Sequence, residues 1–138
     1  MDDIDRHRDE AYMHIALAMA HAGARAGEVP VGAIVVMKGQ VIAAAHNAPI
    51  ACHDPTAHAE VLALRAAAQW ARNYRVPGAV IYVTVEPCVM CIGALLHARV
   101  ARIVFGCYET KGGALGSVYN IGQDRRGNHR VQVTGGVL

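Results

Sequence analysis

The sequence predicts an α/β protein whose sheet is antiparallel at its start and parallel later, with helices on both faces. The first observation behind this expectation is the order of its segments: helix, β-hairpin, helix, strand, helix, strand. The second is composition: of 138 residues, 54% are hydrophobic and 17% are charged, which is enough apolar material for a core. Because no repeat, linker or low-complexity tract interrupts the pattern, we expect a single domain over residues 1–138.

The N-terminal part predicts a helix followed by a β-hairpin. We expect the helix over residues 3–24, closed by Gly23. Its apolar side chains recur at helical spacing, at Tyr12, Ile15, Ala16, Met19 and Ala22. The β-branched run 31–37, the turn 38–40 (Lys-Gly-Gln) and the run 41–46 then predict two antiparallel strands.

A loop over residues 47–55 separates the hairpin from a second helix, which we expect at about 58–72. Asp54 or Thr56 is suited to cap this helix, since both side chains can accept a bond from a free backbone N–H. Pro55 suits the first turn.

The remaining segments alternate between strand and helix. Residues 80–85 (Val-Ile-Tyr-Val-Thr-Val) predict a buried strand, and Pro87 opens a third helix to about residue 97. Residues 100–105 predict another strand. The glycine-rich segment 108–128 is expected to be loop or short irregular helix, and 130–133 a last strand.

Two short segments carry residues with metal chemistry: 56–60 (Thr-Ala-His-Ala-Glu) and 86–91 (Glu-Pro-Cys-Val-Met-Cys). Cys88 and Cys91 are three positions apart, so at the start of a helix both sulfurs lie on one face, where the helix dipole favours thiolate. Two thiolates and one imidazole suit zinc, and His58 supplies the imidazole. A catalytic zinc keeps three protein ligands and an open position for water.

Glu60 follows His58 by two positions, so on a regular helix their side chains diverge by about 200°. The two side chains therefore cannot both bind a metal from the side of one helix. We assign Glu60 as the proton shuttle for the water, not as a ligand. The open alternative is a closed structural zinc site, whose candidate fourth ligands are Cys52, His53, His97 and Cys107.

Together, H-x-E and P-C-x-x-C form the signature of zinc-dependent nucleobase deaminases. From about Tyr12 to Leu138 the chain resembles the cytidine deaminase-like superfamily and, within it, the bacterial tRNA-specific adenosine deaminases. Beyond the metal motifs, the matching stretches are 28–33 (Glu-Val-Pro-Val-Gly-Ala), Asn47, 53–56, 82–84, 104–106 and 128–130.

The resemblance implies a three-layer α/β/α cytidine deaminase-like fold with a five-stranded mixed sheet, forming one zinc-dependent deaminase domain over residues 1–138. It implies one Zn²⁺ per subunit, held by His58, Cys88 and Cys91, with Glu60 as the catalytic residue. The implied reaction is hydrolytic deamination of adenosine to inosine at the wobble position of tRNA, by a zinc-activated water. The implied partners are the tRNA anticodon stem-loop and a second copy of the chain in a homodimer.

Further positions are expected to contact the substrate. In the family that the chain resembles, the residues matching Asn47, Val29, Pro30 and Val85 line the base pocket, and an Asn can bond an adenine edge. The alternatives are a hairpin-ending turn residue for Asn47 and plain core for the other three. Glu86 is left without a role. Candidate nucleic-acid contacts are Glu109, Lys111, Arg125, Arg126, His129 and Arg130.

Charge and length bear on the choice of substrate. Residues 1–98 hold seven Lys/Arg and nine Asp/Glu, whereas residues 99–138 hold six and two, so the last part is basic and suits a phosphate partner. Two differences from the tRNA enzymes bear on substrate choice: the first favours other substrates, and the second alters a loop expected beside the nucleic acid. Those enzymes continue beyond the position of Leu138 into a basic helix, and they commonly carry Asp where this chain has Glu109.

The alternative substrate is therefore a free base or nucleotide (guanine, cytosine or dCMP) or cytidine in single-stranded nucleic acid, with the same zinc chemistry.

The helix 91–97 offers Ile92, Leu95 and Leu96 either to a dimer interface or to the core. The charged residues 1–10 lack a secretory h-region, and no apolar run approaches the roughly 20 residues that span a bilayer. We expect a cytoplasmic protein with no membrane partner.

Overall fold

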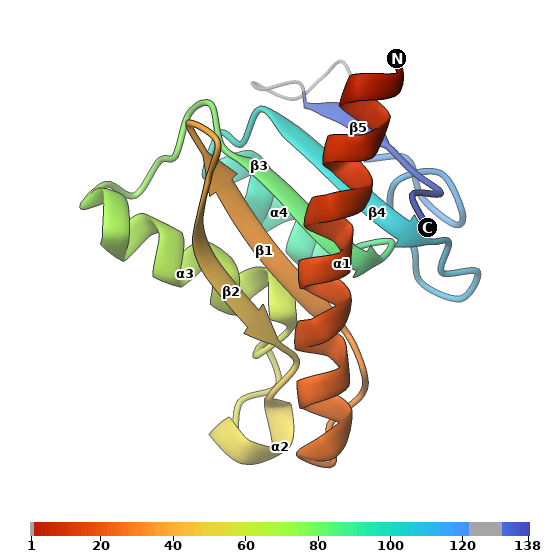
Figure 1. The fold of residues 1–138 in the computed structure, drawn as a ribbon. Coiled ribbons are helices and arrows are strands. Elements are labelled where there is room, and N and C mark those ends of the chain that lie inside the picture. The colour runs from red at the N-terminus through yellow and green to blue at the C-terminus, as the bar shows by residue number, and fades with distance from the viewer. Residues whose placement is uncertain (1, 122–130) are drawn as a thin grey trace.

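The structure is a computed structural model, and it describes residues 2–121 and 131–138 (Figure 1). Along the chain its elements are α1 (Asp3–Arg25), β1 (Gly32–Met37), β2 (Gln40–His46), α2 (Pro49–Cys52), α3 (Ala59–Ala71), β3 (Val80–Val85), α4 (Val89–His97), β4 (Arg102–Cys107) and β5 (Gln132–Thr134).

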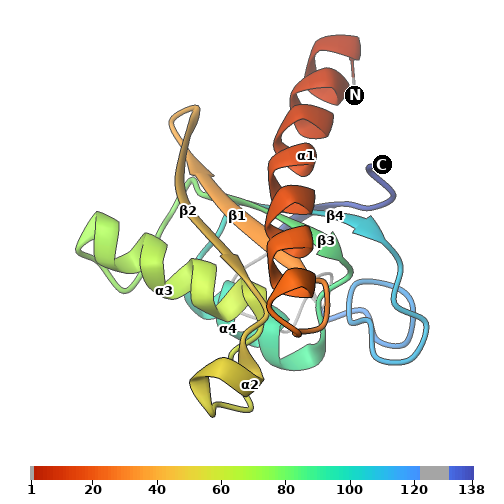
Figure 2. The same cartoon turned by 60° about the horizontal axis from the view of Figure 1, so that its bottom comes forward.

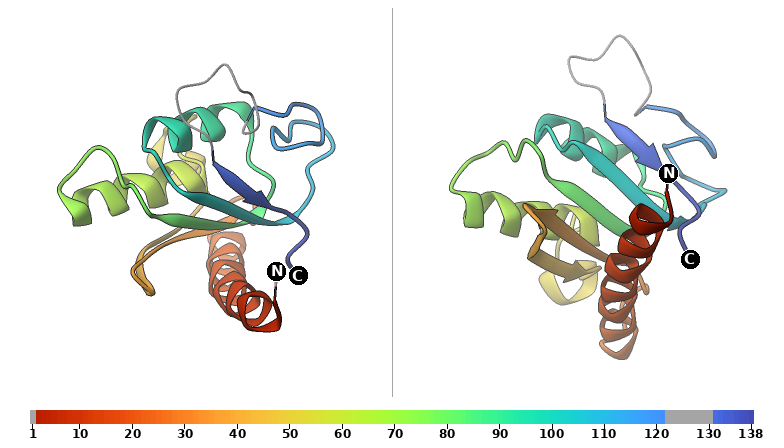
Figure 3. Two further views of the ribbon diagram at one scale, coloured as in Figure 1. Left: turned by 90° about the horizontal axis from the view of Figure 1, so that it is seen from above. Right: turned by 45° about the horizontal axis from the view of Figure 1, so that its top comes forward.

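The strands form a five-stranded sheet in the order β2-β1-β3-β4-β5. β1 runs antiparallel to both β2 and β3, whereas β3, β4 and β5 run parallel to one another. Seen along the sheet, α1 covers one face, and α3 and α4 cover the other (Figure 3). The predicted three-layer α/β/α fold with a mixed sheet is confirmed.

Each face of the sheet has its own apolar cluster. On the α1 side, Met13 and Ala16 pack with Ile34 and Val104. The opposite cluster joins α3 and α4 to the sheet through small and branched side chains, among them Ala63, Ala67, Val35, Ile81, Ile92, Leu95 and Phe105. Ile92 and Leu95 of α4 are fully buried there, so they belong to the core and not to a surface for a second subunit. Leu96 is partly buried.

The buried face of α1 differs from the predicted one. Ile15 is 41% exposed, while Met13 and Ala20 are buried. Gly23 does not close the helix, which continues to Arg25 and is capped by Ala26. A Cβ at Gly23 would lie 3.0 Å from the Cβ of His46. This glycine therefore permits a close approach of α1 to β2 instead of ending α1.

The start of the second helix also differs from the prediction. Neither Asp54 nor Thr56 caps it, because Oδ1 of Asp54 accepts the N–H (2.9 Å) and the O–H (2.7 Å) of Thr56, which closes a turn before the helix. The N-cap is His58, whose backbone is extended.

The expected loop 47–55 contains the short helix α2, which lies near the C-terminal end of α1 (Figure 2). The first amides of α2 donate to the carboxylate of Glu28, from Ile50 at 3.3 Å and from Ala51 at 2.9 Å. Among the described residues, no helix is both long and apolar enough to cross a membrane.

Candidate metal centre

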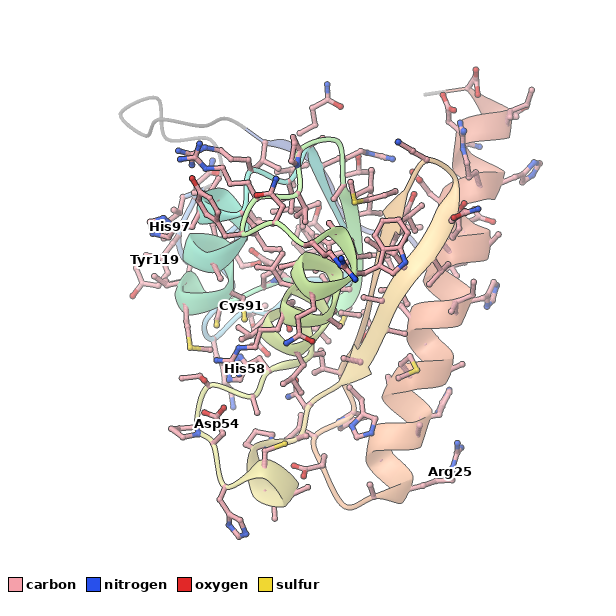
Figure 4. The ribbon with its side chains drawn as sticks, turned by 90° about the vertical axis from the view of Figure 1, so that its left-hand side faces the viewer. Arg25, Asp54, His58, Cys91, His97 and Tyr119 are labelled. Atoms are coloured by element: carbon pink, nitrogen blue, oxygen red, sulfur yellow. The ribbon has the colours of Figure 1, made fainter. Side chains whose placement is uncertain are left out.

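The N-termini of α3 and α4 meet at a cluster of three metal-binding side chains. His58 is the N-cap of α3 and Cys88 the N-cap of α4, both with extended backbone, and Cys91 lies buried in the first turn of α4. The Nδ1 atom of His58 lies 3.7 Å from Sγ of Cys88 and 3.5 Å from Sγ of Cys91. Figure 4 shows His58 and Cys91 next to each other, approaching from different helices.

These distances fit a tetrahedral metal ion. With Zn–N near 2.0 Å and Zn–S near 2.3 Å, a tetrahedral angle places the nitrogen about 3.5 Å from each sulfur. The ligand atoms of His58, Cys88 and Cys91 all lie within 4.8 Å of one another. Over residues 2–121 and 131–138, no fourth His, Cys, Asp or Glu joins this group, so the four candidates for a closed site (Cys52, His53, His97 and Cys107) do not complete it.

The two thiols are coupled. A hydrogen bond from the Cys91 thiol and, to a smaller extent, the charge of the nearby His58 lower the pKa of Cys88 to about 5. The same bond, together with burial, raises the pKa of Cys91. Without a cation the pair therefore holds one negative charge, and a divalent ion is the partner that allows both sulfurs to be thiolates.

Glu60 lies in the first turn of α3, against the two cysteines, and is 5% exposed. Burial raises the pKa of its carboxyl group, and the Cys88 thiolate raises it further, against the opposing effects of its own backbone N–H and His58. A carboxyl group whose pKa is raised above its ordinary value accepts a proton more readily than an exposed glutamate does, as a proton shuttle requires.

The metal-binding group opens onto a small cleft of about 140 Å³. The lining residues come from the ends of β1, β2, β3 and β4, or the residues next to them, and from the two helix N-termini: Val31, Asn47, His58, Glu60, Val85, Glu86, Cys88 and Glu109. A larger cavity, of about 270 Å³, lies between α1 and the sheet. The smaller cleft is the candidate site because it alone of these two combines converging metal ligands with a buried acid.

Asn47 follows β2 and joins the cleft to α3. Its backbone N–H donates to the carbonyl of Val31 at 3.1 Å, and its Oδ1 accepts the N–H of Ala59 at 2.7 Å. The carboxamide therefore satisfies one of the free amides at the start of the helix that carries Glu60. His58, the N-cap residue of α3, makes no side-chain capping hydrogen bond of its own.

Of the other residues predicted to contact the substrate, some line the cleft and some do not. Val85 is partly buried at the end of β3 and lines the cleft. Val29 is 65% exposed and Pro30 is exposed; neither belongs to the core or to the cleft lining, where the next residue, Val31, stands instead. Lys111 is exposed. The candidates Arg125, Arg126, His129 and Arg130 fall outside the described residues.

Sequence reasoning missed two cleft residues, Val31 and Glu86. Glu86 is 3% exposed and accepts hydrogen bonds from Glu109, Leu115 and Ser117. Although burial opposes ionisation, these bonds hold the pKa of Glu86 below its ordinary value. An acid directly before the Pro-Cys pair was visible in the sequence, but its partners lie 23 to 31 positions away and no local pattern indicates them.

Comparison with known proteins shows which family the chain resembles. Residues 6–107 match the family model described as the cytidine and deoxycytidylate deaminase zinc-binding region. The tRNA-specific adenosine deaminase of Haemophilus influenzae is 46% identical over 131 residues, which cover 94% of this chain and 76% of that protein. The Bacillus subtilis enzyme of the same name is 43% identical, over 95% of this chain and 81% of that protein.

Solved structures agree with these relatives. A structure from a study of A-to-I editing by tRNA deaminases at the wobble position superposes with a TM-score of 0.88 at 38% identity, over 91% of this chain and 97% of that chain. A guanine deaminase from Bacillus subtilis has a TM-score of 0.72 at 34% identity, over 80% of this chain and 67% of that chain.

Proposed function

The chain belongs to the zinc-binding cytidine and deoxycytidylate deaminase family, and from this membership we propose that it deaminates adenosine to inosine at the wobble position of tRNA. The observation that carries the proposal is the three-ligand group of His58, Cys88 and Cys91, with Glu60 buried beside it and the cleft in front of both. The identities of 46% and 43% to tRNA-specific adenosine deaminases direct the choice of substrate.

In the proposed reaction, water adds its oxygen to C6 of adenine, the bond from C6 to the amino nitrogen breaks, and ammonia leaves. When bound, the zinc ion supplies a Lewis acid that brings the pKa of a coordinated water to about 7. Glu60 accepts the water proton and delivers protons to the ring and then to the departing amine, as its raised pKa allows.

Asn47 is proposed to orient the base. Because its Oδ1 accepts the N–H of Ala59, the Nδ2 amide is the donor that this side chain has left for a ligand. The cleft of about 140 Å³ is smaller than the roughly 300–1,000 Å³ of sites for drug-sized ligands. It therefore suits a single base flipped out of an unpaired loop, with the rest of the nucleotide outside.

The partners beyond the substrate are also proposals. We propose a homodimer, and the apolar side chains that α4 leaves exposed, Val89 at 45% and Met90 at 37%, support it. Sedimentation at micromolar concentration tests the oligomeric state. Glu109 and Lys111 are proposed to contact the RNA, and a tRNA substrate leads us to propose a cytoplasmic location.

The proposed activity is tested with a synthetic anticodon stem-loop that carries adenosine at the wobble position. We expect inosine at that position by mass spectrometry after incubation with the zinc-loaded protein, and none in a matched stem-loop with cytidine there. A second candidate, guanine deamination, is favoured by the 34% identity to the Bacillus subtilis guanine deaminase. Xanthine from free guanine, together with an unchanged stem-loop, would replace the first proposal by the second.

A further inference from the structure

A buried carboxylate next to the metal-binding turn holds together a long segment of irregular structure. Glu86 follows β3, two positions before Cys88, and is 3% exposed. Its Oε1 accepts the N–H of Glu109 at 3.1 Å and the O–H of Ser117. Its Oε2 accepts the N–H of Leu115 at 2.9 Å and the N–H of Ser117 at 3.1 Å.

The segment that these bonds hold, residues 109–117, follows β4 and has neither helix nor long strand to order it. Its backbone bonds are those of turns: the N–H of Gly113 donates to the carbonyl of Glu109 at 2.9 Å, the N–H of Gly116 to that of Tyr119 at 2.8 Å, and the carbonyl of Gly113 accepts from Val118 and Tyr119 at 3.0 Å. Ala114 donates its N–H to the carbonyl of Pro87 at 2.8 Å and accepts the N–H of Ile121 at 3.0 Å. Hydrogen bonds to an ionised acceptor are stronger than neutral ones. In addition to these turn bonds, the Glu86 carboxylate accepts four hydrogen bonds that join both ends of the loop, Glu109 and Ser117, to the turn that follows β3.

The loop is shaped around the carboxylate. A Cβ at Gly113 would overlap the carboxyl group of Glu86 and would lie 2.6 Å from the carbonyl oxygen of Glu109. The adjacent Gly112 has no such neighbour, since a Cβ there meets nothing within 4 Å. Neither glycine has a positive φ, so close contact with the Glu86 carboxyl group and with the Glu109 carbonyl oxygen, and not backbone conformation, distinguishes Gly113 from Gly112.

Glu86 is not placed to act as a second proton shuttle. Four hydrogen-bond donors surround its two oxygen atoms, so an ionised carboxylate satisfies them and a protonated one would lose a bond. Glu86 and Glu109 nevertheless line the same cleft as His58 and Cys88. Through Pro87 and Cys88, the carboxylate links the metal-binding turn directly to the loop at the cleft.

We propose that Glu86 is a positioning residue, which holds loop 109–117 at a fixed place relative to the metal ligands and thereby shapes the cleft edge that receives the RNA substrate. The proposal rests on the proposed function for the identity of that substrate. It assigns Glu86 no contact with the reacting atoms: Glu86 acts through the loop that it anchors, and above all through Glu109.

The test of this positioning role compares alanine substitutions at two neighbouring glycines. Gly113→Ala places a methyl group against the Glu86 carboxylate, and Gly112→Ala is the matched control. Glu86→Gln removes the charge with little change in shape and keeps one acceptor oxygen. Each protein is loaded with zinc, and three quantities are measured: zinc content, hydrogen exchange of residues 109–117, and kcat and KM for the anticodon stem-loop.

We expect full zinc content in all three variants. In Gly113→Ala and Glu86→Gln, the amides of residues 109–117 should exchange faster than in the wild type, and KM for the stem-loop should rise about tenfold or more with kcat within about threefold. Gly112→Ala should match the wild type in every measurement. A fourth variant, Glu86→Ala, removes every acceptor, so its increases in amide exchange and in KM should exceed those of Glu86→Gln.

Equal exchange in Gly113→Ala and Gly112→Ala would overturn the proposal, and so would a loss confined to kcat with KM unchanged. If Glu86→Ala fails to fold, Gly113→Ala and Glu86→Gln still decide the outcome. The exchange measurement needs no substrate. A wild-type protein that leaves the stem-loop unchanged, with a loop that still loosens in Gly113→Ala, would therefore end the proposed function and not the anchoring of the loop.

Discussion

At the scale of single residues, the metal centre separates ligands from the group that moves protons. His58 and Cys88 are N-caps with extended backbone, so their side chains project beyond the ends of α3 and α4. Glu60 lies inside the first turn of α3 and is 5% exposed. This offset lets two residues that are two positions apart face the same point, which the side of a regular helix would not permit.

Replacing Glu60 by Gln should leave the fold and the zinc content unchanged and lower kcat by roughly 10²- to 10⁴-fold, since an amide cannot shuttle protons. Steady-state inosine formation and elemental analysis provide the measurements. Glu10→Gln, on α1 and outside the cleft, is the matched control and should keep wild-type turnover. Turnover retained in Glu60→Gln would remove Glu60 from the mechanism.

Replacing Cys88 or His58 by Ala should abolish both bound zinc and deamination, because two donors do not hold a catalytic zinc firmly. Cys107→Ala removes an exposed thiol outside the metal-binding group and should retain both. A Cys88→Ala protein that binds zinc stoichiometrically would show that the ion sits elsewhere.

At the scale of elements, the site depends on how the β-hairpin supports α3. Asn47 follows β2, and its Oδ1 accepts the Ala59 N–H at 2.7 Å, so it serves as a capping group from another element. His58, the formal N-cap, makes no side-chain capping bond and keeps its imidazole for the metal. The hairpin therefore performs the capping task that the metal ligand cannot perform.

Asn47→Ala should lower the free energy of unfolding by about 1 kcal/mol, as expected for loss of a helix-capping group. Asn47→Asp keeps the acceptor oxygen and should have an unfolding midpoint nearer to wild type, yet both variants should raise KM because both lack the Nδ2 donor. Urea denaturation and stem-loop kinetics separate the two effects. An Asn47→Asp protein with unchanged KM would contradict the role of Nδ2 in binding the base.

At the scale of the whole molecule, a buried ionic network fastens α1 to the sheet on the face opposite the metal centre. Asp9 of α1 is 2% exposed and accepts hydrogen bonds from Tyr82 of β3 at 2.8 Å and from Arg102 of β4 at 2.9 and 2.6 Å. Arg102 also donates to Thr134 of β5 at 2.9 Å. The Asp9 carboxylate thus connects α1 directly with β3 and β4, and Arg102 extends the network to β5. The helices that carry the metal ligands, α3 and α4, cover the other face of the sheet.

Stability should depend on pH through Asp9. Burial opposes its ionisation, but the bonds from Arg102 and Tyr82 and the Arg102 charge outweigh burial, so the pKa of Asp9 lies below its ordinary value. The network therefore stabilises the fold above the unfolded pKa of about 3.9 and loses this contribution as the pH falls through the lower folded pKa. Asp9→Asn should lower the free energy of unfolding by about 3 kcal/mol at pH 7 and by less near pH 3.

Denaturant unfolding at both pH values measures this difference. The control Asp3→Asn removes only an exposed ion pair with Arg6, so it should change the free energy of unfolding by less than about 0.5 kcal/mol. A loss in Asp9→Asn that is as large at pH 3 as at pH 7 would contradict the ionic explanation.

The amino-acid sequence alone determined the order of the elements, except for the short helix α2, and the residues that carry the chemistry. Both are local properties: side-chain periodicity separates helix from strand, and the short spacings of His58 with Glu60 and of Cys88 with Cys91 are visible within a few positions. Only the tertiary structure decided which side of α1 is buried, what caps α3, and that Glu86 anchors loop 109–117. Those contacts join residues 12 or more positions apart, and sheet register and packing, not local propensity, bring them together.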